Sequence, residues 1–194
     1  MRTLAAIAFS VICISSMAHA QTARELTSKM RRNLPTLYSI DLGKTWANIT
    51  ETQPIGIDFA GKARPNQNCG EDTHFTITLD FDNALAYAST KDVLDSFDIR
   101  TMSTKVRQMF YPNGEVYERT APTRHPFANT EAYSGYYSVT FSDGRRYRMR
   151  HYTTFQSGYF VHVDTYNLSK DDLRAAPCFT SLFEGIHFRK VIAK

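Results

Sequence analysis

Three arginines alternate along one segment of the sequence, at Arg146, Arg148 and Arg150. Alternate residues of a strand point to the same side of a sheet, so a strand here would present the three guanidinium groups as one cationic row. Guanidinium groups bind carboxylates and phosphates through paired N–H donors. Tyr152 continues the row, and tyrosine and arginine are both enriched at the energetic centres of protein interfaces. The pattern predicts a surface that binds a protein partner or an anionic molecule.

The segments around this row predict an antiparallel meander. Residues 136–141, 145–155 and 159–166 alternate between apolar and polar side chains, and each connection between them ends in a glycine. Connections of three residues with a final glycine suit hairpins that need a positive φ at that position. We therefore expect Phe141 to pair with Arg145 and Phe155 to pair with Tyr159, because this register gathers the apolar side chains on one face.

The same register places His162 and Asp164 on the arginine side, with Arg150 opposite Tyr136 and Asp164, Tyr152 opposite His162, and Arg148 opposite Tyr166. The residues expected to bind a ligand or partner are Arg146, Arg148, Arg150, Tyr152, His162 and Asp164. The residues expected in the core on the other face include Val139, Tyr147, Met149, Val161 and Val163, and His151 there is expected to be a hydrogen-bonded core residue.

Two other interpretations of the arginine side remain open. The side chains could form an ordinary solvent-facing strand surface with Arg150–Asp164 as a cross-strand pair, or a helix could cover the row while the arginines extend around it. A third interpretation treats Tyr152, His162 and Asp164 as acid–base groups of a small hydrolase-like envelope enzyme. The sequence offers no nucleophile beside them, and we expect no catalytic residue.

The first 20 residues are typical of a secretory signal. A single arginine precedes an apolar stretch that is too short to span a bilayer, and Ala18-His19-Ala20 matches a cleavage site. We expect cleavage between Ala20 and Gln21, which places the protein in the periplasm or outside the cell. Residues 21–50 are expected to be a helical or irregular segment, and residues 51–194 a single domain with no transmembrane anchor.

Removal of the signal leaves two cysteines, Cys69 and Cys178. Paired thiols usually oxidise in such a compartment, and neither cysteine lies in a metal-binding pattern. We therefore expect one structural disulfide, no metal and no cofactor. The charge balance of 23 Lys+Arg against 19 Asp+Glu is far from the dense cationic footprint of a nucleic-acid-binding protein. The oligomeric state and the identity of the partner stay undetermined.

Helical patterns lie on both sides of the meander. Apolar residues in 89–110 fall into two stripes that point in different directions, which predicts a break near 98–101. Pro177 is expected to open a closing helix that carries Phe179, Leu182 and Ile186 on one face. The fold class expected is α+β, an antiparallel meander packed against helices on its N-terminal side and at the C-terminus in an α/β/α sandwich.

This order of elements, which ends in an aromatic hairpin and a helix over 178–188, resembles the PsbP-like/DcrB-like group of small exported α/β/α domains. The resemblance covers about 55–188 and carries no residue motif, so it transfers no site residues. It implies a binding or accessory scaffold rather than an enzyme. We therefore expect a non-enzymatic periplasmic binding protein that engages a secreted or envelope protein or an anionic envelope molecule. An inhibitor or immunity-type protein is one form that it could take. An accessory subunit without a ligand of its own is the remaining alternative.

Overall fold

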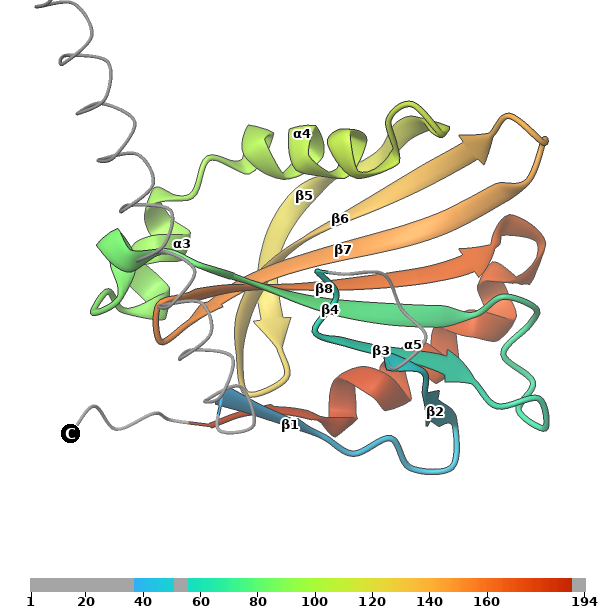
Figure 1. Cartoon of the computed structure of the whole chain (residues 1–194), viewed down its shortest axis with the longest axis horizontal. Helices are drawn as coiled ribbons and strands as arrows, with labels where there is room; N and C mark the ends of the chain where they lie inside the picture. The colour runs from blue at the N-terminus through green and yellow to red at the C-terminus, as the bar shows by residue number, and fades with distance from the viewer. Residues whose placement is uncertain (1–36, 51–55, 190–194) are drawn as a thin grey trace, which may run out of the picture. The chain divides into compact units, whose positions relative to one another are not determined.

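The computed structural model describes residues 37–50 and 56–189. The expected signal peptide and its cleavage site therefore lie outside the described residues. The compact unit that begins at Tyr38 is built on a seven-stranded antiparallel sheet (Figure 1). Its strand order is β2 (Trp46–Asn48), β3 (Phe59–Ala63), β4 (His74–Phe81), β8 (Tyr159–Leu168), β7 (Arg146–Gln156), β6 (Thr130–Phe141) and β5 (Gly114–Phe127).

A separate pair of short strands joins β1 (Tyr38–Ile40) to β9 (Ile186–Phe188). Since β2 pairs with β3 in the main sheet, residues 38–50 belong to the same unit as the rest of the domain. The part of the expected 21–50 segment that the structure describes is therefore integrated into the fold by strand pairing.

The helices are α3 (Thr90–Ser96), α4 (Ile99–Phe110) and α5 (Asp172–Gly185). The expected break between the two apolar stripes is confirmed, because α3 ends at Ser96 and the Asp98 side chain accepts a hydrogen bond from the Arg100 N–H at the start of α4. The expectation that Pro177 opens a helix is wrong. Pro177 lies inside α5, which begins at Asp172.

Helices cover both faces of the sheet, and we call these the α4 face and the α5 face. On the α4 face, Val106 of α4 packs into a core with Val116, Tyr137, Val139 and Met149 of the strands. On the α5 face, Phe179 of α5 stacks on Trp46, and Phe183 contacts Tyr152 of β7. This arrangement confirms the expected α+β class with helical layers on either side of an antiparallel sheet (Figure 1).

The register within the meander is confirmed for one hairpin and wrong for the other. Phe141 and Arg145 close a three-residue connection, and Arg150 lies opposite Tyr136 as expected. The second connection has two residues, Ser157 (φ 50°) and Gly158 (φ 87°), so β7 and β8 are shifted by one residue. Two successive positive φ angles are the signature of a type I′ turn, whose twist matches that of the strands.

The shift puts Asp164 opposite His151, His162 opposite Thr153 and Tyr166 opposite Met149. The expected Arg150–Asp164, Tyr152–His162 and Arg148–Tyr166 pairs are therefore wrong. The physical reason is that both faces of the sheet are covered by helices, so apolar side chains occur on both. The expected register was the one that gathers the apolar residues of all three strands on one face. That criterion cannot identify the register of a sheet that is apolar on both faces.

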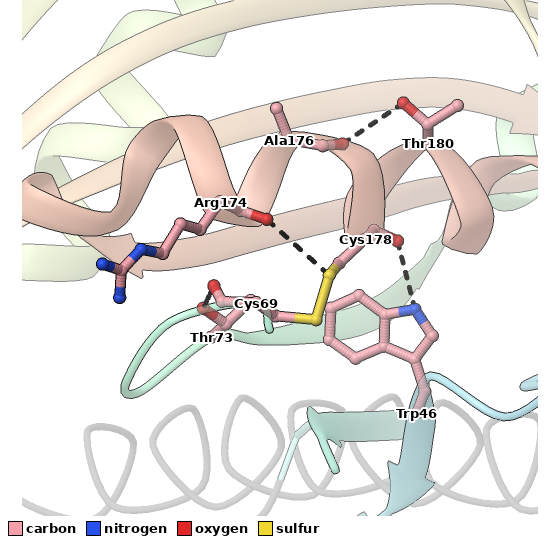
Figure 2. The surroundings of a disulfide bond; sticks show 7 residues. All are labelled: Trp46, Cys69, Thr73, Arg174, Ala176, Cys178 and Thr180. Atoms are coloured by element: carbon pink, nitrogen blue, oxygen red, sulfur yellow. Dashed lines mark hydrogen bonds between the residues drawn. A yellow bond between two sulfur atoms is a disulfide. The ribbon is translucent and has the colours of Figure 1, made fainter. Parts of the chain in front are cut away.

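The expected disulfide is present and joins the loop before β4 to α5 (Figure 2). Cys69 and Cys178 are 109 residues apart in the sequence, and their Cα atoms lie 6.0 Å apart. The Trp46 indole N–H donates to the Cys178 carbonyl at 3.2 Å, and Thr73 donates to the Cys69 carbonyl at 2.7 Å. Both ends of the bridge are thus fixed by hydrogen bonds as well as by the covalent bond.

Candidate functional site: an arginine surface and a buried histidine chain

The sheet separates the six residues expected to form one site. Arg146, Arg148, Arg150 and Tyr152 belong to the α5 face, whereas His162 and Asp164 belong to the α4 face, since residues paired across β7 and β8 share a face. The three arginines stay together, but the proposed acid–base group of Tyr152, His162 and Asp164 is not assembled on one face.

Arg150 is built into the start of α5. Its guanidinium lies over the Tyr136 ring, 4.8 Å from the centroid, and one of its nitrogens is 3.6 Å from the Asp172 carboxylate. The Tyr136 hydroxyl donates to the other oxygen of Asp172 at 2.5 Å. Since Asp172 is the first residue of α5, these contacts join the outer strands to the helix.

Arg148 and Arg146 are held less firmly. Arg148 donates to the Ser138 hydroxyl across the strand pair, and Arg146 is exposed. Among the described residues, no carboxylate forms an ion pair with either guanidinium. We call Tyr136, Arg146, Arg148, Arg150 and Asp172 the arginine surface. Its outer part is solvent-accessible, because α5 contacts β8 but covers little of β6 and β7 at this end (Figure 1).

Tyr152 does not belong to this surface. Its ring is buried between Phe127, with which it stacks at 5.0 Å, and Phe183 of α5, whose centroid lies 4.6 Å away. Burial raises the pKa of its hydroxyl to about 12. Tyr152 therefore anchors α5 to the sheet.

On the opposite face, five side chains form a continuous chain of polar contacts that we call the histidine chain. Lys105 Nζ lies 2.7 Å from His162 Nε2, and His162 Nδ1 lies 3.0 Å from Thr153 Oγ1. Thr153 Oγ1 lies 3.1 Å from His151 Nε2, and His151 Nδ1 contacts the Asp164 carboxylate. The two histidines, Thr153 and Asp164 are all buried.

The protons of this chain can be assigned because an ammonium only donates. Lys105 donates to His162 Nε2, His162 Nδ1–H donates to Thr153, the Thr153 hydroxyl donates to His151 Nε2, and His151 Nδ1–H donates to Asp164. In this arrangement each of the four contacts in the chain joins one donor to one acceptor. The direction of the His162 pKa agrees with this assignment, because burial lowers it below the ordinary value of 6.5.

The outer end of the chain is ionic. Lys105 of α4 also pairs with Asp80 of β4, whose carboxylate is 3.2 Å from His162 Nε2. A hydrogen bond from His162, when its Nε2 carries a proton, and the Lys105 ammonium hold the pKa of Asp80 well below its ordinary value of 3.8. The chain therefore ties α4 to the sheet and carries a run of hydrogen bonds from the surface to buried Asp164.

Asp164, His151 and Thr153 have the order of contacts seen in carboxylate–histidine–hydroxyl triads. Their side chains are at most 1% exposed, so no substrate atom could reach Thr153 in this conformation. The part of the chain that the structure describes contains no group of three or more His, Cys, Asp or Glu residues suited to a metal ion. It also contains no helix long and apolar enough to cross a membrane.

Sequence reasoning found only part of these sites. His151 was expected to be a hydrogen-bonded core residue, which its contacts to Asp164 and Thr153 confirm. Nothing in the sequence marked Thr153 as a bridge between the two histidines. Lys105 and Asp80 lie 25 residues apart and carried no signal.

Comparison with known proteins gives a fold but no family. No protein-family model matches the sequence, and no curated protein matches it. The structure is similar to the solution structure of cyanobacterial PsbP (CyanoP) from Synechocystis sp. PCC 6803, with 12% identity, a TM-score of 0.53 and coverage of 79% of this chain and 88% of that one. It is also similar to LpqN, involved in cell envelope biogenesis of Mycobacterium tuberculosis, with 8% identity, a TM-score of 0.50 and coverage of 78% and 83%. The expected resemblance to the PsbP-like group is confirmed at the level of fold.

Proposed function

We propose that this protein is an exported, non-enzymatic binding protein that engages an anionic partner through the arginine surface. The observation that carries the proposal is the state of Arg146 and Arg148. They stand on alternate positions at the start of β7, where Arg146 is exposed and Arg148 is partly buried, and no described carboxylate forms an ion pair with either of them. Two uncompensated guanidinium groups on alternate positions of a paired strand have a fixed backbone spacing, so together they can receive an incoming carboxylate or phosphate.

Export is supported by the disulfide and by the sequence of residues 1–20. The Cys69–Cys178 bond is of the kind that persists in an oxidising compartment and is rare in the cytosol. An apolar stretch followed by Ala18-His19-Ala20 is typical of a cleavable signal. The similarity to LpqN, a protein described as involved in cell envelope biogenesis, is consistent with a role in the envelope.

The proposal is tested by reversing charge where the surface is uncompensated. The double variant Arg146→Glu/Arg148→Glu of the full chain is compared with the parent in capture of proteins from an envelope extract and in binding to vesicles that contain phosphatidylglycerol. We expect binding of the true partner to weaken by roughly tenfold or more, because reversal adds like-charge repulsion to the loss of contacts. Added salt should weaken the parent complex in the same direction.

The matched control is Lys44→Glu/Arg100→Glu, which makes the same change in net charge at two exposed positions outside the arginine surface. Binding that falls equally in both double variants would reflect net charge alone. Binding that survives the Arg146/Arg148 reversal at low salt would mean that this face is only a solvated strand surface. Either result would overturn the proposal.

A further inference from the structure

A shallow hollow of about 300 Å³ opens beside the arginine surface, between the connection of β6 to β7 and the turn before α5. Its lining residues are Gly144, Arg146, Leu168, Ser169 and Lys170. Arg146 is therefore shared between the arginine surface and the hollow. Lys170 supplies a second cation, and its ammonium pairs with Glu71 at 2.9 Å through side chains that are both largely exposed. Exposed pairs of this kind contribute little and exchange readily.

One residue in the wall of the hollow has an unpartnered hydroxyl. The Ser169 Oγ atom is buried, and no described residue forms a hydrogen bond with it. Burying a hydroxyl without a partner is unfavourable, and a native structure usually satisfies it with protein, water or a ligand. Rotation about χ1 would turn this hydroxyl towards the hollow, where a guanidinium and an ammonium already line the wall, and a carboxylate bound there would then have three donors.

An exposed apolar residue directly follows the last residue of the arginine surface in the sequence. Leu173 is 92% exposed, and it directly follows Asp172, which contacts both Tyr136 and Arg150. A leucine exposed to this degree at the second residue of a helix buries no apolar area within the described fold. Next to tyrosine and arginine it completes the kind of cluster that carries binding energy at protein interfaces, an apolar anchor surrounded by polar groups.

We infer, on the basis of the proposed function, that the partner is a protein that places one carboxylate side chain in the hollow and encloses Leu173 in an apolar socket. A membrane surface is a poorer match. Recognition of an anionic bilayer relies on clusters of unopposed cations, whereas Glu71, Asp171 and Asp172 stand among the cations here. A protein surface can match such mixed charges one by one.

The test begins with a photo-crosslinking residue at position 173, as the variant Leu173→p-benzoylphenylalanine of the full chain, expressed in its own host. The protein crosslinked there is identified by mass spectrometry and purified, and its dissociation constant is measured by calorimetry for the parent and three variants. Leu173→Ser removes the anchor, and Ser169→Ala removes the hydroxyl donor. Tyr87→Ser is the control, because Tyr87 is 96% exposed and lies outside the arginine surface and the hollow.

We expect Leu173→Ser to weaken binding by roughly tenfold or more and Ser169→Ala by severalfold, with Tyr87→Ser unchanged. Removing the contacted carboxylate of the partner should weaken binding less in Ser169→Ala than in the parent, because the two changes then share one lost contact.

Two results would overturn the inference while leaving the proposed function standing. One is a partner whose binding depends on Arg146 and Arg148 but not on Leu173 or Ser169. The other is binding to phosphatidylglycerol vesicles that Arg146→Glu/Arg148→Glu abolishes, without any protein crosslinked at position 173. If Arg146→Glu/Arg148→Glu still binds both the protein partner and the vesicles, the inference and the proposed function are both overturned.

Discussion

The imidazole rings of His151 and His162 lie face to face on neighbouring strands, with centroids 5.3 Å apart and planes 15° apart. Thr153 Oγ1 bridges His151 Nε2 and His162 Nδ1 at their edges. Two imidazolium ions stacked in this way would repel each other in a buried site, so the arrangement disfavours protonation of both rings at once. The stacked pair makes the stability of the fold sensitive to pH.

Acidification should therefore destabilise the protein between pH 7 and pH 5. Burial lowers the pKa of His162 and of His74 below the ordinary value of 6.5, so the unfolded chain binds these protons more readily than the folded one. The free energy of unfolding keeps the full contribution of these histidines above pH 6.5. It falls as the pH drops below 6.5, by up to about 1.4 kcal/mol per pH unit for each histidine. Urea unfolding at several pH values measures this slope, and His162→Gln should reduce it. An unchanged slope in that variant would remove His162 from the explanation.

Thr153→Val should cost about 1–3 kcal/mol, because it keeps the shape of the side chain but leaves two buried imidazole nitrogens without their shared partner. Thr154→Val is the matched control on the same strand. It removes one hydrogen bond to the Glu131 carbonyl and should cost about 1 kcal/mol. Chemical denaturation measures both losses of stability. NMR of the imidazole nitrogens should show a changed His162 signal in Thr153→Val and an unchanged one in Thr154→Val. Equal costs and unchanged imidazole signals would contradict the proton assignment.

Arg150 and Arg148 should respond differently to charge reversal although they stand two residues apart. Arg150→Glu should destabilise by about 1–3 kcal/mol, since it loses the contact with Tyr136 and confronts Asp172 with a second carboxylate. Arg148→Glu loses a hydrogen bond to Ser138 at an accessible position, so it should cost under about 1 kcal/mol. Thermal melts of the two variants test the difference. Similar losses would show that Arg150 is not a structural link to α5.

Breaking the disulfide should be the most destabilising of these changes. Cys178→Ser opens a covalent loop spanning 109 residues, for which the chain-entropy model gives about 4–5 kcal/mol. Denaturant unfolding of the variant measures the loss. In the processed protein, labelling of unfolded but unreduced material should find no free thiol. Two labelled thiols per chain would mean that the bond does not form in the exported protein.

The sequence by itself determined the three meander strands, the break between α3 and α4, and the covalent link. Alternation of apolar and polar residues located the meander strands, the change in direction of two apolar stripes located the break between α3 and α4, and two remaining cysteines specified the disulfide. These features depend on local periodicity and composition. Val161 and Val163 were expected on the same face as Val139 and Met149, which is wrong, because the register pairs them with Thr154 and Tyr152 on the α5 face. They are nevertheless buried as expected, since helices cover both faces.

Tertiary structure alone decided which polar residues meet. A one-residue difference in the β7–β8 turn moved His162 and Asp164 from the arginine side to the α4 face and gave them His151 and Thr153 as partners. The positive φ angles of Ser157 and Gly158 that set this register depend on strand pairing and twist. The position of α5 then decided that Arg150 and Tyr152 are held by the helix while Arg146 and Arg148 stay accessible. Contacts between segments far apart in the sequence are set by packing, and no local pattern encodes them.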